Sequence, residues 1–311
     1  MFRLRLIKDK TNINFMGMRK FSYAFSILLT VIMFTLLFTR GFNLGIDFTG
    51  GVLMEVKMPA GTKIEDLRRQ LSSLSAGEPS IQDFGQDSVM IKIPGSETDA
   101  AGQKALRAEV ETLLGDGAEF RRMEFVGPQV GGELITASIK AFVYSMIGIL
   151  IYIWARFEWQ FGLVAVVGLA HDMMATMLFF LVTQLEFSLS TVAAALLIAG
   201  YSINETVVVF DRIRETMRKY KKMPMSDLIN MSINEVLSRT AITFVLTFIA
   251  LLSLVLFGGH VIRSFAYAML AGILFGPYSS MLISATLLSY MKLRQPTADK
   301  EEAAAPEGQT A

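Results

Sequence analysis

Residues 21–39 read FSYAFSILLTVIMFTLLFT, an apolar run without a charged side chain that directly follows Arg19 and Lys20. An α-helix rises about 1.5 Å per residue, so about 20 apolar residues are needed to cross roughly 30 Å of hydrocarbon. The run has this length. It exceeds the apolar core of a cleaved signal peptide, and no small-x-small cleavage site follows it, so we expect a retained first membrane span.

The rest of the 311-residue chain contains further runs of the same kind. Its composition is 52% hydrophobic and only 18% charged, with a mean hydropathy of +0.46, which argues against a purely soluble domain. The chain is therefore predicted to be a polytopic α-helical membrane protein with six transmembrane helices. The five additional spans are expected at 134–155, 161–183, 187–210, 240–258 and 264–290.

Composition also excludes several classes of site. The chain has no cysteine, which rules out disulfides, thiolate metal sites and cysteine nucleophiles. Its two histidines make a structural zinc site improbable. A net charge of +1 gives no reason to expect nucleic acid as a partner. We expect no metal and no bound cofactor.

The distribution of Lys and Arg predicts the orientation of the spans. Basic residues are concentrated in 1–20 and in 211–239, whereas the short loops 184–186 and 259–263 contain one basic residue between them. Both termini are therefore expected in the cytoplasm. The loop 40–133, with 10 basic and 15 acidic residues, is expected on the opposite, periplasmic side.

This large loop has the pattern of a folded domain. Residues 51–58 alternate between apolar and polar side chains, as a half-buried strand does. A capping box from Thr62 to Glu65 is expected to open a helix. A hairpin at 80–93 that turns near 85–87, a helix at 98–114 and a strand at 119–126 complete the order β-α-β-β-α-β. This is the ferredoxin-like α+β arrangement.

The predicted organisation along the chain follows from these segments. The last stretch is polar and rich in Ala and Pro, which is typical of disorder. The expected parts are a cytoplasmic N-terminal segment 1–20, a first span 21–39, a periplasmic domain 40–133, a five-helix bundle 134–292 that includes a basic cytoplasmic loop 211–239, and a disordered cytoplasmic tail 293–311.

Ionisable residues within the spans are the candidate functional groups, because a buried Asp costs about 2.5 to 3.5 kcal/mol even on the insertion scale. Asp172 lies midway along the third span, next to His171, and Glu205 lies in the fourth. Arg239 stands at the entrance of the fifth. Glu205 is predicted to alternate between a protonated form and a form paired with Arg239. The alternative is a static ion pair, with Asp172 bonded between helices and His171 simply packed.

Two kinds of intramembrane protease are alternative functions for these polar residues. A serine protease would pair Ser202 with His171, but the sequence GYSIN lacks a glycine after the serine. An aspartyl protease would bring Asp172 and Asp211 together, but Asp211 lies at the end of a span. We expect the chain not to be an enzyme.

The segment GFNLGIDFTGGVLMEV, residues 41–56, joins the first span to the first strand. It lacks the Lys-Ser/Thr ending of a P-loop, and no helix pattern follows its glycines. Gly45, Gly50 and Gly51 are expected to permit tight turns, and Asp47 to cap one of them.

Five motifs in order resemble the SecF family of bacterial protein-export subunits. They are LGIDFTGG at 44–51, HDM at 171–173, GYSINETVVVFDRIRE at 200–215, SRT at 238–240 and FGG at 257–259. The resemblance covers roughly residues 15–292. It implies half of a resistance-nodulation-division transporter fold in the bacterial inner membrane, pairing with SecD, and association with the SecYEG channel and YajC.

The resemblance also implies a function and roles for residues. Proton motive force would drive motion that promotes preprotein translocation after the ATP-driven steps of SecA, with protons as the coupling ion. A proton relay is implied at Glu205, Arg239, Asp172 and His171, a coupling hinge at Gly45, Asp47, Gly50 and Gly51, and further motif positions at Asn204, Asp211 and Arg212. Gly168, Gly200 and Gly272 would allow close approach of moving helices.

One position departs from the family pattern, and two alternatives stay open. The family commonly has Asp where this chain has Glu205, which changes the reach of the carboxyl group toward Arg239. The first alternative function is half of a lipid or small-molecule exporter of the same superfamily, acting as a dimer. The second is an assembly factor without proton coupling.

Overall fold

The computed structural model divides the chain into two units, a helical bundle and a sheet domain. The sheet domain comprises Asn43–Phe142 together with Glu186–Leu189, and the bundle comprises the rest. The described residues are 11–59, 62–74, 79–83, 88–94, 100–115, 117–258, 260–291 and 293. The expected disordered tail, apart from residue 293, and the first ten residues lie outside them.

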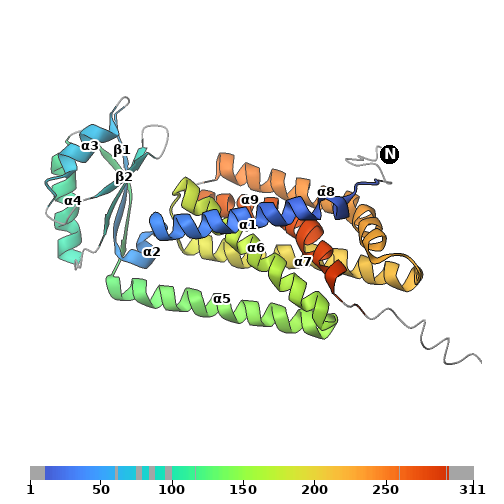
Figure 1. The fold of residues 1–311 in the computed structure, drawn as a ribbon. Helices are drawn as coiled ribbons and strands as arrows, with labels where there is room; N and C mark the ends of the chain where they lie inside the picture. Colours follow the sequence, from blue (N-terminus) through green and yellow to red (C-terminus); the bar gives the residue numbers. More distant parts are fainter. Residues whose placement is uncertain are drawn as a thin grey trace, which may run out of the picture. The chain divides into compact units, whose positions relative to one another are not determined.

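Within the described residues, six helical segments are long and apolar enough to cross a membrane, which confirms the predicted number of spans (Figure 1). The last span runs through several helical types. The segments are α1 (Phe15–Thr39), α5 (Pro128–Arg156), α6 (Trp159–Thr183), α7 (Leu189–Lys219), α8 (Met225–Phe257) and a final span formed by α9 (His260–Tyr278), the π-helical η1 (Ser279–Ser284), α10 (Ala285–Leu287) and the 3₁₀ turn η2 (Leu288–Tyr290).

The range 211–239 is mostly helix, so its prediction as a loop is wrong. α7 continues to Lys219 and α8 begins at Met225, directly after Pro224, which leaves a turn of only a few residues. Both extensions keep an apolar face, because Ile213 and Ile233 are fully buried. Charged residues end the hydrophobic window of a span, but Arg, Lys and Glu are good helix formers and do not end the helix.

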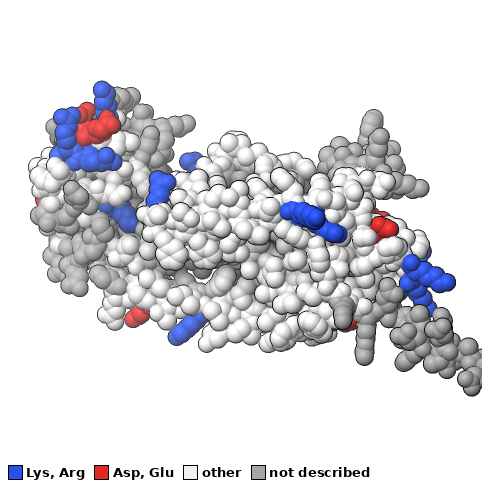
Figure 2. All heavy atoms as spheres, viewed as in Figure 1, with Lys and Arg blue, Asp and Glu red and all other residues white. Residues whose placement is uncertain are grey.

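α6 lies at the centre of the bundle and packs against α1, α9 and η1. In the most apolar 18-residue stretch of α6, 61% of the residues are buried. In the corresponding stretch of α5, no residue is buried. On the face drawn in Figure 2, most of the surface over the long helices carries no Lys, Arg, Asp or Glu. Apolar surface of this extent is stable only in a bilayer or under a partner, as expected for a multi-pass membrane protein.

Two glycines bring helices of the bundle into close contact. A Cβ atom added at Gly168 would lie 2.1 Å from the Ser284 hydroxyl oxygen, and one added at Gly272 would lie 2.5 Å from Ile198. The close approach expected at these two positions is confirmed. It is not found at Gly200, where an added Cβ meets no atom within 4 Å.

The sheet domain has the predicted order of strands and helices. Its elements are α2 (Ile46–Thr49), β1 (Gly51–Lys57), α3 (Ile64–Leu71), β2 (Ser80–Asp83), β3 (Ser88–Pro94), α4 (Ala100–Leu114) and β4 (Glu119–Val126). The strand order is β2-β3-β1-β4, and every neighbouring pair is antiparallel. This confirms the ferredoxin-like arrangement.

Two details of the sheet domain bear on the predictions. α3 begins at Ile64 with Lys63 as its N-cap and no side-chain cap bond, so the capping box expected at Thr62 is wrong. The Thr62 hydroxyl instead donates to the Pro59 carbonyl at 2.7 Å. The expected turn at 85–87 lies outside the described residues, although the hairpin pairing of β2 with β3 is present.

Candidate functional site: polar residues of the bundle and the Gly45–Gly51 segment

Asp172 on α6 is fully buried and accepts hydrogen bonds from two other elements. The hydroxyls of Ser202 on α7 and Ser279 on η1 both donate to its Oδ2, the latter at 2.8 Å. Ser279 was not expected from the sequence. Two serines stand in an apolar run just after Pro277, and this pattern could have indicated a polar contact there. Because proline lacks an N–H group, it favours an irregular helical turn at this point.

His171 extends this polar cluster toward α1. Its Nδ1 lies 3.4 Å from Asp172 Oδ1, and its ring packs against Tyr278 with the centroids 5.5 Å apart. The Tyr278 hydroxyl donates to the Ser22 carbonyl of α1 at 2.8 Å. His171 Nε2 is buried and has no hydrogen-bond partner among the described residues.

The contacts of Ser202 and Asp211 do not form a protease site. Ser202 donates to Asp172, and no hydrogen bond joins it to His171 in the described part of the chain. Asp211 pairs with Arg156 at 2.8 Å and does not face Asp172. Neither intramembrane protease arrangement is present among these residues.

Glu205 lies one turn beyond Ser202 on the same buried side of α7 and is only 5% exposed. Its Oε1 accepts a hydrogen bond from the Thr243 hydroxyl of α8 at 3.2 Å. Its Oε2 is buried without a partner among the described residues. The two carboxyls of the spans are therefore connected by one turn of α7, because Ser202 and Glu205 are three residues apart.

Arg239 is near Glu205 but does not form an ion pair with it. The nearest link is Thr243, whose hydroxyl lies 3.2 Å from both Glu205 Oε1 and the Arg239 carbonyl oxygen. Among the described ion pairs none joins the two side chains, so the interpretation as a static ion pair is wrong. Asn204, the neighbouring motif residue, is exposed.

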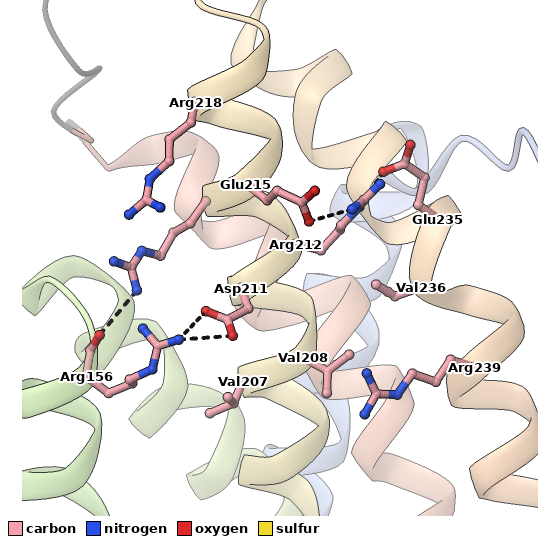
Figure 3. A pocket seen from close by; sticks show the side chains of 11 residues that line it. Arg156, Val207, Val208, Asp211, Arg212, Glu215, Arg218, Glu235, Val236 and Arg239 are labelled. Atoms are coloured by element: carbon pink, nitrogen blue, oxygen red, sulfur yellow. Dashed lines mark hydrogen bonds and ion pairs between the residues drawn. The ribbon is translucent and has the colours of Figure 1, made fainter.

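The charged end of α7 forms a network with α5 and α8 (Figure 3). Arg156 donates to both carboxylate oxygens of Asp211, at 2.8 and 3.1 Å. Arg212 binds Glu215 at 2.5 Å and Glu235 at 2.6 Å. These residues line a cavity of about 770 Å³ together with Val207, Val208, Arg214, Arg218, Val236 and Arg239.

The Gly45–Gly51 segment, expected as a hinge, is bound to the loop between α6 and α7. Gly45 donates its N–H to the Phe187 carbonyl at 2.8 Å, and Phe187 donates to the Asn43 carbonyl at 2.8 Å. The Leu189 N–H donates to Asp47 Oδ2 at 2.8 Å. Residues 186–189 are thereby built into the sheet domain, a contact that no local pattern in the sequence predicted.

The glycines of this segment have different roles. Gly50 and Gly51 have φ angles of 66° and 124°, where glycine is strongly favoured. Gly45 has an ordinary φ of −68°. Its missing side chain instead leaves room for Glu186, since an added Cβ would lie 3.0 Å from Glu186 Oε1. Asp47 binds Leu189 and not a turn of its own segment, contrary to expectation.

A charged cluster accompanies this contact. The Lys92 ammonium of β3 donates to the Leu44 carbonyl and interacts with Glu186 and Asp47. Burial raises the pKa of Glu186, which nearby Lys92 partly offsets. Burial likewise lowers the pKa of Lys92. The segment 186–189 therefore holds a partly desolvated carboxyl against the sheet domain.

Comparison with known proteins identifies the family. The family model described as "Protein export membrane protein SecD/SecF, C-terminal" matches residues 107–294, and the "SecD/SecF GG Motif" matches residues 35–58. A "Protein translocase subunit SecF" of Rickettsia bellii is 44% identical over 291 residues, which are 93% of this chain and 96% of the relative. The chain belongs to the SecF family.

Another SecF of this family, from Rickettsia felis, is 42% identical over 297 residues, or 94% of this chain and 96% of the relative. These relatives are named as translocase subunits, which are transport components and not enzymes. The GG motif match contains Gly45, Asp47, Gly50 and Gly51, the residues bound by the α6–α7 loop.

Solved structures of SecDF have the same fold. The crystal structure of SecDF from Thermus thermophilus, a translocon-associated membrane protein, superposes with a TM-score of 0.83 at 34% identity over 92% of this chain. SecDF in a super-membrane-facing form gives a TM-score of 0.68 at 34% identity over 97% of this chain. This SecF-family chain spans only 39% and 41% of those longer chains.

Proposed function

We propose that this chain is a subunit of the Sec protein translocase that uses proton movement to promote preprotein translocation. In this proposal it pairs with SecD, associates with SecYEG and YajC, and acts after the ATP-driven steps of SecA. It lies in the bacterial inner membrane with both termini in the cytoplasm. Membership of the SecF family supports the role in translocation. The half-bonded carboxyl of Glu205 is the observation that carries the coupling to protons.

The contacts of Glu205 suit a carboxyl that gains and loses a proton. An ionised carboxylate buried in low dielectric needs hydrogen-bond donors or a cation. Here the Thr243 and Thr240 hydroxyls both lie within hydrogen-bonding reach of the carboxyl, and Oε2 still has no partner among the described residues. The protonated acid fits this environment. The ionised form would require Arg239 to approach, so each proton transfer would change the contacts between α7 and α8.

Proton movement supplies enough free energy for such a change. One elementary charge crossing 100 mV provides about 2.3 kcal/mol, which is comparable with the roughly 1 to 3 kcal/mol of a typical allosteric coupling. A few protons per cycle would therefore suffice to bias two arrangements of the helices.

The α6–α7 loop provides a route from the bundle to the sheet domain. α6 carries Asp172 and α7 carries Glu205, and the loop between them contributes residues 186–189 to the sheet domain. Three hydrogen bonds fix these residues to the Gly45–Gly51 segment or its neighbour Asn43. A shift of α7 would act directly on this attachment, in addition to any motion passed through the first span.

Proton-dependent export in membrane vesicles tests the proposal. We expect Glu205→Gln to assemble normally and to lose the part of preprotein export that depends on the proton gradient. The matched control is Glu215→Gln, the same substitution on the exposed side of α7, where the side chain is 65% accessible, and it should keep that activity. Full proton-dependent export by Glu205→Gln would overturn the proton role.

The proposed partners are tested separately by co-purification from membranes. Recovery of the chain with SecD and channel subunits supports the translocase assignment. Recovery only as a homodimer would instead support the exporter alternative. Assembly of Glu205→Gln with its partners, together with a normal rate of export, would support an assembly factor without proton coupling.

A further inference from the structure

The cavity at the charged end of α7 has a wall of arginines on the side that faces α5. Arg156 comes from the last turn of α5, and Arg214 and Arg218 come from successive turns of α7. Arg214 and Arg218 share a face because they are four residues apart. Figure 3 shows Arg156 and Arg218 on the same side of the cavity, across from Arg239.

Two of these arginines are positioned by an aromatic cluster. The guanidinium carbons of Arg156 and Arg214 lie 5.0 and 5.1 Å from the centroid of the Phe157 ring. Phe157 is itself buried and packs against Phe161 and Phe210, with centroids 5.8 and 5.9 Å away. Cation–π contacts with a fixed ring hold the guanidinium groups in place, so less ordering is required when a ligand binds.

The positive charge of this wall is only partly neutralised. Asp211 pairs with Arg156, and Arg214 donates to the Arg156 carbonyl at 3.2 Å. The side chain of Arg218 forms no ion pair or hydrogen bond with any described residue. Glu215 and Glu235, the other two carboxylates of the cavity, are bound by Arg212. On this side of the cavity, the three positive charges of the arginines are therefore balanced by the single carboxylate of Asp211. A bound anion would stabilise this arrangement.

The cavity also has the dimensions and the lining that a phosphate group requires. Its volume is about 770 Å³, and Val207, Val208 and Val236 supply apolar lining. The planar fork of arginine matches the oxygens of a phosphate and can bind them in pairs. Basic pockets between the ends of transmembrane helices are suited to the phosphate of an anionic lipid headgroup.

We propose that Arg156, Arg214 and Arg218 form a binding site for a phosphate group, either the phosphodiester of an anionic lipid or free phosphate. This site does not depend on the proposed proton pathway, because none of the three arginines contacts Asp172 or Glu205 in the structure. Arg218 and Arg214 supply the uncompensated charge, while Arg156 shares its charge with Asp211.

Binding to the purified full-length chain tests this site. The chain in neutral detergent is titrated with dioleoylphosphatidylglycerol, with dioleoylphosphatidylcholine and with inorganic phosphate, and bound lipid is counted by native mass spectrometry. Phosphate binding is followed through the unfolding temperature. We expect saturable binding of the anionic probe. Arg218→Gln and Arg214→Gln should each weaken it about tenfold, as expected for the loss of a charged hydrogen bond.

The matched control is Lys222→Gln, which removes the same charge from an exposed position in the turn after α7. It should change the affinity less than about twofold, since Lys222 does not line the cavity. Binding of phosphatidylglycerol without inorganic phosphate identifies a lipid headgroup, and phosphate binding with the same variant pattern identifies free phosphate. Equal weakening by Lys222→Gln, equal binding of phosphatidylcholine, or no saturable binding overturns the proposal.

Discussion

The carboxyl groups of Asp172 and Glu205 are bound very differently, although one turn of α7 connects them. Asp172 accepts hydrogen bonds from hydroxyls on α7 and η1. Glu205 is approached by hydroxyls of α8 alone, and its Oε2 has no partner among the described residues. A carboxyl that accepts hydroxyls from two other elements stabilises one arrangement of helices. A carboxyl with an unfilled acceptor holds its neighbours less firmly. The comparison separates an acid bonded from two other elements from one with an open acceptor, and the proposed proton role falls on the second.

The packing around each group explains this difference. Gly168 lets η1 approach α6 so closely that an added Cβ would reach Ser284, and the same approach brings Ser279 to Asp172. Glu205 faces α8, where Thr243 and Thr240 present their hydroxyls to it. The four predictions that follow are ordered by their expected effect on the free energy of unfolding.

Removing the Asp172 carboxyl should have the largest effect. Asp172→Ala leaves the buried hydroxyls of Ser202 and Ser279 without their acceptor, so we expect the free energy of unfolding to fall by about 2 to 3 kcal/mol. Denaturation in mixed micelles measures it. A loss well under 1 kcal/mol would show that the bonds to Asp172 do not hold α6, α7 and η1 together.

The second prediction concerns Gly168, which allows α6 and η1 to approach each other closely. Gly168→Ala places a methyl group against the Ser284 hydroxyl, 2.1 Å away without relaxation, and should cost about 2 kcal/mol. The double variant with Ser284→Ala should recover much of this loss. Gly200→Ala is the control, because nothing lies within 4 Å, and it should be neutral or slightly stabilising. Equal effects at the two glycines would refute the packing argument.

Glu205 should contribute less to stability than Asp172. Glu205→Gln keeps an oxygen that accepts from Thr243, so we expect the free energy of unfolding to change by less than about 1 kcal/mol. The same denaturation assay as for Asp172→Ala measures it. A destabilisation as large as that of Asp172→Ala would remove the distinction between the two carboxyls.

The smallest expected effect is a pH-dependent weakening of the contact between residues 186–189 and the Gly45–Gly51 segment. Because burial raises the pKa of Glu186 above its ordinary value of 4.5, the folded state binds that proton more tightly than the unfolded chain does. The attachment should therefore weaken as pH rises from about 4.5 through the raised pKa. The charged groups around Glu186 are Lys92 on β3, Asp47 on α2 and Glu124 on β4.

Hydrogen exchange at Gly45 and Phe187 measures this attachment, after correction for the intrinsic pH dependence of exchange. Glu186→Gln should make the protection of these two amides nearly independent of pH over the same window. Protection that increases with pH in the unmodified chain would show that the electrostatic attraction of Lys92 outweighs the burial of Glu186.

Much of the fold followed from local sequence. Runs of about 20 apolar residues are sufficient to predict spans, because a bilayer sets the required length. Alternation and helical periodicity identified the four strands and two helices of the βαββαβ unit. The end of α7 was misplaced because hydropathy marks the edge of the membrane, whereas helix formation continues through charged residues.

The candidate site was predictable only in part. Asp172 and Glu205 could be selected because ionisable residues in spans are costly. The absence of an ion pair between Glu205 and Arg239, and the bond from Ser279, depend on helix packing that the spacing of these residues does not encode.

The sequence alone determined the number of spans, the strand order along the chain, the family and the unusual acids, since each depends on local composition or on a motif. Only the tertiary structure decided which acid is bonded from two other elements, which glycine faces a neighbouring helix, and that the α6–α7 loop belongs to the sheet domain. Phe187 and Asn43 are far apart in sequence yet share a hydrogen bond of 2.8 Å. Such contacts arise from the packing of whole elements, which no single segment of sequence specifies.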